Sequence, residues 1–316
     1  MTISQFTVIV IFTLTGTLSF AMIYNYSNFY LIYGQTNNTN DTNTNIDKLD
    51  NISSSKHVKV GDIDISYTIF GKGDPILLIN GYSLSKNGWD PTFLKELSAN
   101  HTVIIFDNRG VGNTTAGSKN FTIEQFAADS AGLLDALNIP KFDVLGFSMG
   151  GMIAQQLTLN FLDKVDDLII YASSCGGNQS IPPSKQIQQQ ITELTGPAED
   201  IKKRFIPLLF NPNWIEQNPD YMKKFTSFEL PPIGILQKQG EAIFSWKGTC
   251  DQLRDISRDT LMVTGTDDIL LPSANSIILT ENIPGAWLAQ FKEGGHGVMY
   301  QYPEKLSAIV NTFLDN

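Results

Sequence analysis

From His57 to the C terminus, short apolar runs rich in β-branched residues alternate with amphipathic stretches of helical periodicity. The run from His57 to Phe70 predicts a hairpin with its turn at Gly61-Asp62. Six further strands are predicted, at 76–79, 102–106, 142–145, 168–172, 260–264 and 287–291. Their continuous apolar character is typical of strands covered on both faces. This alternation predicts an α/β fold with a mostly parallel, doubly wound sheet.

Two features between the strands refine this prediction. Thr122 has the position of a helix N-cap, with Gln125 three residues on, and predicts a helix over 122–137. Residues 176–249 contain eight of the chain's 14 prolines, together with helical fragments and no convincing strand. So long a segment is not expected to be bare loop in a compact domain. We therefore interpret 176–249 as a helical cap inserted after the sixth strand. Its large apolar residues should mostly pack it onto the sheet, and some should line an apolar pocket.

The N-terminal region has a different character. No charged side chain occurs before Asp41, and Phe6–Tyr24 is a 19-residue, predominantly apolar run of membrane-spanning length. The run lacks the basic start and the cleavage site of an ordinary secretory signal. Residues 1–34 are therefore interpreted as either a signal peptide or an uncleaved membrane anchor, which could hold the protein at a membrane.

Residues 35–56 are rich in Asn, Thr and Ser and nearly devoid of apolar side chains. Such a segment buries too little surface to offset the entropy of ordering, so it predicts a disordered polar tether. Eight N-x-S/T sequons fit a protein exported from the cytoplasm; they start at Asn25, Asn37, Asn40, Asn51, Asn100, Asn113, Asn120 and Asn178. Cys175 and Cys250 either form a disulfide in that compartment or remain free thiols.

Composition excludes several functional classes. The formal net charge of −10 argues against a nucleic-acid partner, which needs a basic face. Two cysteines cannot build a disulfide framework or a Cys-based zinc module, and three histidines leave little for a His-rich metal centre.

The strand at 142–145 leads into Gly146-Phe-Ser148-Met-Gly150 and then into a helical stretch. A sharp strand-to-helix turn of this G-x-S-x-G type presents its serine as a nucleophile. The helix N-terminus directs free N–H groups at the same place. This context favours Ser148 as a catalytic nucleophile over an ordinary turn serine.

A serine nucleophile needs a base and a carboxylate that orients it. His57 borders the tether and His101 lies in a turn before a strand, so both are interpreted as surface residues. His296 follows the last predicted strand within a glycine-rich loop and is the remaining candidate base. Asp267 and Asp268 both follow the strand at 260–264, at the edge where such sheets assemble sites. The residues themselves do not choose between the two carboxylates.

The order serine, aspartate, histidine is that of the α/β-hydrolases. Residues 57–316 resemble this superfamily, specifically its capped esterase, lactonase and cofactor-free haloperoxidase-like branch. The matching motifs are Asn80-Gly81-Tyr82, Phe106-Asp107-Asn108-Arg109-Gly110-Val-Gly112, Gly146-Phe-Ser148-Met-Gly150, Gly265-Thr-Asp-Asp268 and Gly295-His296-Gly297. The family pattern G-x-x-D implies that the third triad residue is Asp268.

The resemblance also implies an oxyanion hole formed by the backbone N–H groups of Tyr82 and Met149. The family usually has His-Gly where this chain has Asn80-Gly81, a departure that should spare backbone donors. The loop 107–112 is interpreted as architectural, with Arg109 binding neighbouring carbonyl groups.

These observations predict a serine hydrolase that cleaves a carboxylic ester, or a related acyl bond, of a small, apolar substrate through an acyl-enzyme, without a metal or organic cofactor. The same three residues would also serve haloperoxidase-like, lactonase or C–C hydrolase chemistry, because fold does not choose among reactions. A slow-turnover, ligand-sensing protein is a third alternative. Neither the substrate nor the oligomeric state follows from the sequence.

Overall fold

The computed structural model describes residues 21–24, 29–32, 55–221 and 229–316. Most of the predicted signal or anchor segment and of the predicted tether lies outside these residues. The end of the apolar run forms strand β1 (Ala21–Tyr24), which pairs antiparallel with β2 (Phe29–Ile32) in a separate two-stranded sheet. Lys56, placed in the tether by the sequence, is the first residue of strand β3. Within the described residues no helix has the length and apolar character needed to cross a membrane.

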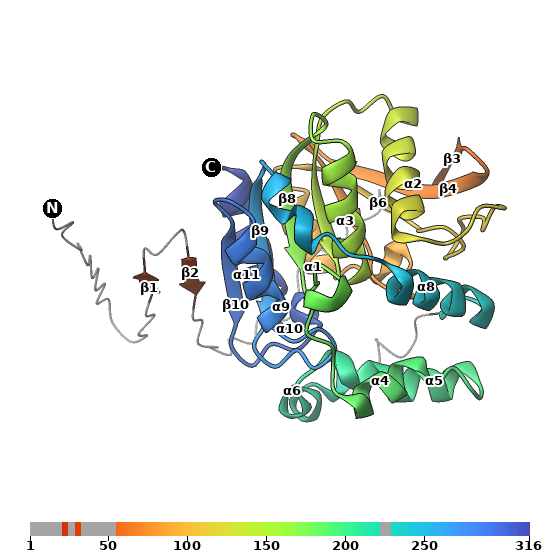
Figure 1. Ribbon diagram of the computed structural model, residues 1–316, viewed down its shortest axis with the longest axis vertical. Helices are drawn as coiled ribbons and strands as arrows, with labels where there is room; N and C mark the ends of the chain where they lie inside the picture. Colours follow the sequence, from red (N-terminus) through yellow and green to blue (C-terminus); the bar gives the residue numbers. More distant parts are fainter. Residues whose placement is uncertain (1–20, 25–28, 33–54, 222–228) are drawn as a thin grey trace, which may run out of the picture.

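The main sheet has eight strands in the order β10-β9-β8-β7-β5-β6-β4-β3. Strand β4 pairs antiparallel with both of its neighbours, the edge strand β3 and β6, and all the other pairs of the sheet are parallel. The predicted mostly parallel, doubly wound sheet is therefore confirmed (Figure 1). The strands span Lys56–Val60 (β3), Ile63–Gly71 (β4), Pro75–Ile79 (β5), Thr102–Phe106 (β6), Phe142–Phe147 (β7), Val165–Tyr171 (β8), Asp259–Gly265 (β9) and Trp287–Phe291 (β10).

The strands are apolar throughout because both faces of the sheet are covered. In β5, Leu77 and Ile79 belong to one buried hydrophobic cluster, and Ile76 and Leu78 belong to the other. Successive side chains of a strand point to opposite faces, so a continuous apolar run supplies both cores.

Several helices contribute buried side chains to each cluster. Helices α2 (Ile123–Ala136), α3 (Met149–Asn160) and α9 (Ala274–Asn282) supply buried side chains to the first. Helices α1 (Pro91–Leu97), α10 (Val298–Gln301) and α11 (Pro303–Leu314) supply the second. The predicted N-cap of α2 is present, because the Thr122 hydroxyl accepts the Gln125 N–H at 3.0 Å.

The segment between β8 and β9, here called the cap segment (176–249), carries helices and no strand in its described part. The helices are α4 (Lys185–Thr192), α5 (Ala198–Phe205), α6 (Pro212–Gln217) and α8 (Ile233–Ser245). Figure 1 shows α4, α5 and α6 grouped at one end of the molecule.

The two ends of the cap segment are tied together at the sheet. Cys175 and Cys250 form a disulfide, which settles the alternative that the sequence left open. The Thr249 N–H donates to the Cys175 carbonyl at 2.7 Å, and the Thr249 hydroxyl donates to Gln155 Oε1 at 2.7 Å. The Gln155 amide in turn donates to the Ser174 carbonyl at 3.0 Å. Helix α3, which follows Ser148, therefore binds both ends of the cap segment.

Arg109 is architectural, but it acts mainly through carboxylates. Its guanidinium is 1% exposed and donates to both oxygens of Asp129 at 2.8 Å and to both oxygens of Asp62 at 2.9 and 3.0 Å. One carbonyl, that of Ala116, receives a further bond. Hydrogen bonds from Arg109 hold the pKa of Asp62 well below its usual range. The arginine thus ties the hairpin turn to helix α2.

The expectation for His101 was wrong. Its side chain is buried, because the C-terminal helix α11 packs against α1 and covers the turn that holds it. Burial lowers its pKa, and Asn311 and Asp315 of the C-terminal region face it. His57 is exposed, as predicted, with Nδ1 3.1 Å from Asp64 Oδ2.

Candidate active site

Ser148 occupies the sharp turn between β7 and α3. Its backbone φ of +58° is a conformation that costs energy for a residue with a Cβ. Two glycines allow the turn, since a Cβ on Gly146 would overlap the Gly150 carbonyl and one on Gly150 would overlap the Ile79 carbonyl. The Ser148 N–H is bound to the Tyr171 carbonyl at 2.9 Å. The strained serine is thus held by the neighbouring strands and faces a cavity.

The structure brings His296 and Asp268 together. Nδ1 of His296, in the loop after β10, lies 2.8 Å from Oδ2 of Asp268, in the loop after β9. The other Asp268 oxygen accepts the N–H groups of Leu270 and Leu271, each at 2.9 Å. Both side chains of the pair are buried. This geometry leaves His296 Nε2 as the ring nitrogen available for chemistry.

The Asp267 carboxylate has other hydrogen-bond partners than His296. It is exposed and accepts a hydrogen bond from the Asn211 side-chain amide of the cap segment and another from the Thr266 hydroxyl. The carboxylate next to His296 is therefore Asp268, as the family pattern implied.

The predicted oxyanion-hole residues border the same cavity as Ser148 and His296. Among the described residues, neither the Tyr82 N–H nor the Met149 N–H has a hydrogen-bond acceptor. Gly81 permits the close approach of this turn to the serine, since a Cβ there would lie 3.0 Å from that of Ser148.

Asn80, which departs from the family pattern, stabilises the turn that carries Tyr82. The Asn80 side-chain amide donates to the Ser85 carbonyl at 2.6 Å. The backbone carbonyl of Asn80 accepts a hydrogen bond from the Asn108 side-chain amide at 3.1 Å. The asparagine is fully buried. The asparagine that stands here in place of the family's histidine therefore leaves the backbone donors in place, and its hydrogen bond to Ser85 closes the loop.

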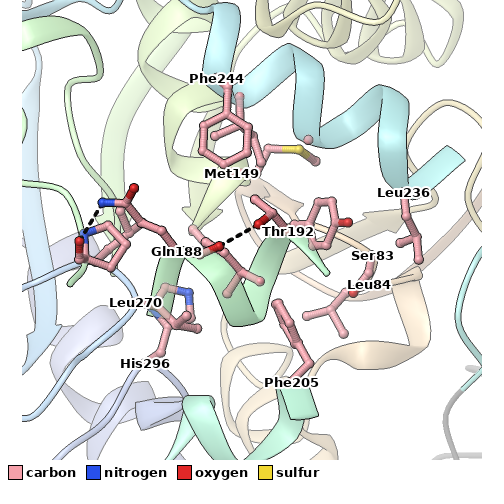
Figure 2. Close-up of a pocket in the computed structure, with 18 of the residues that line it drawn as sticks. Ser83, Leu84, Met149, Gln188, Thr192, Phe205, Leu236, Phe244, Leu270 and His296 are labelled. Carbon is pink, nitrogen blue, oxygen red and sulfur yellow. Dashed lines mark hydrogen bonds between the residues drawn. The ribbon is translucent and has the colours of Figure 1, made fainter. Parts of the chain in front are cut away.

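The cavity has a volume of about 500 Å³ and lies between the sheet and the cap segment. Figure 2 shows Phe205, Leu236 and Phe244 from the cap segment together with Met149, Leu270 and His296 from the sheet side. Large apolar residues of the cap segment, among them Phe205, Leu209 and Phe244, line the cavity. Phe210 and Trp214 stack on each other instead, with ring centroids 4.7 Å apart. Phe225 and Phe228 lie outside the described residues.

The cavity carries little charge. Among its described lining residues there is no lysine or arginine, and Glu241, near the exposed Phe244, is the one carboxylate. Burial raises the pKa of the Tyr82 phenol to about 12, so this side chain stays neutral at physiological pH. In the described part of the chain, no group of three or more His, Cys, Asp or Glu side chains could hold a metal ion.

Two polar residues around the site were not found from the sequence. The Tyr171 hydroxyl, at the end of β8, contacts the His296 loop. Gln239 of α8 contacts the turn that follows Tyr82. In the sequence, Tyr171 is the last residue of an apolar strand and Gln239 is one of several glutamines. No local pattern marks either residue as a contact of the site.

Comparison with known proteins agrees with the fold and the motifs. Residues 74–303 match the family model described as the alpha/beta hydrolase fold. A protein of Azorhizobium caulinodans named as a carbamate hydrolase is 28% identical over 257 residues, which cover 80% of this chain and 96% of that protein. The 2-hydroxy-6-oxo-2,4-heptadienoate hydrolase of Pseudomonas putida is 25% identical, over 84% of this chain and 97% of that enzyme.

A solved esterase from Thermogutta terrifontis superposes with a TM-score of 0.73 at 23% identity, covering 83% of this chain and 98% of the esterase. The chain belongs to the α/β-hydrolase family. It is an α/β-hydrolase enzyme.

Proposed function

We propose that the protein is a serine hydrolase that cleaves carboxylic esters of small, neutral, apolar acids. The observation that carries this proposal is that Ser148 and His296 border one cavity whose other walls are mostly apolar. The buried Asp268 behind His296 and the two unpaired amides of Tyr82 and Met149 add the remaining parts that acyl transfer requires.

In this mechanism His296 Nε2 takes the proton of the Ser148 hydroxyl as the oxygen attacks the ester carbonyl. Asp268 holds the imidazole in the tautomer with Nδ1 protonated and stabilises its cation. The oxygen of the tetrahedral intermediate accepts hydrogen bonds from the Tyr82 and Met149 amides. His296 then gives the proton to the leaving alcohol. A water molecule, deprotonated by His296, releases the acid from the acyl-enzyme.

The cavity favours esters over the reactions named for two relatives. The substrate in the name of the Pseudomonas putida relative is a carboxylate anion. No lysine or arginine among the described lining residues would pair with such a group, and Glu241 would repel it. A carbamate is small and polar, and it would leave most of an apolar cavity of about 500 Å³ unused. A neutral acyl chain is the ligand that such walls bind best.

The test uses the full chain with p-nitrophenyl esters from acetate to octanoate. We expect kcat/KM to rise as the acyl chain lengthens from acetate, because each buried CH₂ contributes about 0.8 kcal/mol. A fluorophosphonate probe should label Ser148. The Ser148→Ala variant should not be labelled, and its turnover should fall by roughly 10³-fold or more. Folded protein without label or ester turnover would refute the proposal. Stoichiometric labelling with negligible turnover would instead favour the ligand-sensing alternative.

We also propose that the enzyme works outside the cytoplasm, attached through the N-terminal apolar run or released after it. The Cys175–Cys250 disulfide supports this compartment, because disulfides persist in oxidising surroundings and are rare in the cytosol.

A further inference from the structure

A helix of the cap segment contacts the turn that carries the proposed oxyanion donor Tyr82. The N–H of Ser83 donates to Oε1 of Gln239, on α8, at a distance of 2.9 Å. The two residues are 156 positions apart in the chain, and both are buried, with exposures of 2% and 0%. The bond therefore forms only when the cap helix lies on the sheet.

The chemistry of this bond fixes the orientation of the glutamine amide. A backbone N–H can only donate, so the atom facing it must be the side-chain oxygen. Among the described residues the buried Nε2 of the same amide has no acceptor. An apolar side chain would avoid that unpaired group. The reason for a glutamine at this buried position must therefore be the hydrogen bond that its oxygen accepts.

The turn that receives this bond has a strained backbone conformation. Ser83 has φ +67°, a left-handed conformation that a non-glycine residue adopts only when its surroundings hold it. One long backbone hydrogen bond, from the Leu84 N–H to the Gly81 carbonyl at 3.4 Å, lies within the turn, and the Asn80 side chain supports the turn through the Ser85 carbonyl. The Tyr82 ring lies 6.0 Å from that of Phe205, centroid to centroid, so a second cap helix also contacts the turn. Figure 2 shows Ser83 on the cavity wall near Leu236 of α8.

We propose that Gln239 is a positioning residue, which fixes the Tyr82–Ser83 peptide so that the Tyr82 N–H points at the oxyanion. This inference rests on the proposed ester hydrolysis. Ser83 N–H and Tyr82 N–H belong to consecutive peptide units, so the bond to Gln239 restrains the rotation that would turn the Tyr82 donor away. The oxyanion hole is consequently complete only when α8 is seated, and cap closure and transition-state stabilisation are coupled.

Gln239→Met keeps a similar shape and removes the acceptor oxygen together with the unpaired amide nitrogen. We expect kcat for p-nitrophenyl butyrate to fall about 10- to 100-fold with KM changed less than about threefold, since one oxyanion donor is worth roughly 10²- to 10³-fold in kcat. Gln239→Glu keeps an acceptor oxygen and should stay within about threefold of the parent enzyme. Gln239→Asn moves the oxygen away from Ser83 and should resemble Gln239→Met.

A second readout separates positioning from a general structural role. Sulfur accepts hydrogen bonds more weakly than oxygen, so an intact oxyanion hole favours an ester over the matching thionoester. We expect the ester-to-thionoester ratio of kcat/KM to fall in Gln239→Met and Gln239→Asn, and to be kept in Gln239→Glu. Lys238→Met, at an exposed neighbour on α8 that does not line the cavity, is the control and should keep the ratio.

The outcomes separate the two proposals. Unchanged kcat and ratio in a folded Gln239→Met would overturn the inference, and so would a loss of activity with an unchanged ratio. Should Gln239→Met fail to fold, the opposite results expected for Gln239→Asn and Gln239→Glu decide the question. The proposed function fails separately, if the parent enzyme shows no Ser148-dependent turnover of esters.

Discussion

The Tyr171 hydroxyl donates a hydrogen bond to the backbone carbonyl of His296 at 2.9 Å. The same oxygen accepts the Met299 N–H at 3.0 Å, so one buried phenol joins the backbone of His296 to helix α10, which follows it. The Tyr171 ring stacks on Phe147, and Phe147 in turn lies 5.0 Å from the His296 ring, centroid to centroid. The end of β8 therefore orients the proposed base without touching its imidazole.

Tyr171→Phe should misplace the His296 loop. The change leaves a buried carbonyl and a buried N–H without a partner, which costs about 1–3 kcal/mol of the free energy of unfolding. We expect kcat/KM for p-nitrophenyl butyrate to fall by roughly 10-fold, because small displacements of catalytic groups are costly. Chemical denaturation and steady-state kinetics measure the two effects. Tyr302→Phe is the control: it removes a solvent-exposed tyrosine hydrogen bond, to the Lys292 carbonyl at 3.3 Å, away from the cavity. It should change neither the free energy of unfolding nor kcat/KM by much.

Asp268→Asn should reduce kcat by about 10³- to 10⁴-fold, because an amide holds the wrong histidine tautomer and cannot stabilise its cation. Asp267→Asn, one residue away but exposed, should stay within about threefold. Steady-state kinetics on both variants tests the assignment. Equal losses, or a larger loss for Asp267→Asn, would contradict the orientation of the His296 ring described above.

Two carboxylates near the starts of β7 and β8, the buried Asp143 and the half-buried Asp167, should make stability depend on pH. Burial, together with the charge of Asp167, raises the pKa of Asp143 to about 7. Burial and the charge of Asp259 raise the pKa of Asp167 to about 6. The folded state then holds protons that the unfolded chain releases near pH 4, so the free energy of unfolding falls as pH rises from about 4 to 7.

Asp143→Asn removes one of these carboxylates while keeping an oxygen that can accept the Asp167 N–H. We expect the variant to be more stable than the parent by about 1–3 kcal/mol at pH 8 and nearly equal to it at pH 4, since each pKa unit corresponds to about 1.4 kcal/mol. Urea denaturation at the two pH values measures this. Asp163→Asn, at an exposed site, is the control. A gain of equal size at both pH values would contradict the titration account.

The disulfide should stabilise the attachment of the cap segment. Cys175 and Cys250 lie 75 positions apart and enclose the whole insertion, so breaking the bond frees a long loop in the unfolded chain. We expect Cys175→Ser/Cys250→Ser to lose about 2–4 kcal/mol of the free energy of unfolding and to be cut faster by protease within 176–249. Treatment with a reductant should destabilise the parent protein and leave the double variant unchanged.

Protease shaving of intact cells tests the proposed location. We expect the catalytic domain, detected through the fluorophosphonate label on Ser148, to be accessible from outside the cytoplasm. A labelled domain that stays fully protected in the cytosolic fraction would contradict the proposal. N-terminal sequencing of the mature chain then distinguishes a cleaved signal peptide from a retained anchor.

The strand and helix order could be predicted from the sequence because each element carries its own signal. Runs such as 102–106 and 287–291 coincide with β6 and β10, and Thr122 begins α2 as its side chain predicts. The strand-to-helix turn at Ser148 is equally local, since Gly146 and Gly150 are required wherever such a turn occurs.

Only the tertiary structure decided which distant groups meet. Residue type and position along the chain do not distinguish Asp267 from Asp268, and only the family pattern favoured Asp268; the turn after β9 places Asp268 next to His296. Tyr171 and Gln239 acquire partners 125 and 156 positions away, and His101 is covered by a helix from the other end of the chain. Hydrogen bonds and burial of this kind depend on the packing of whole elements, and no short stretch of sequence records them.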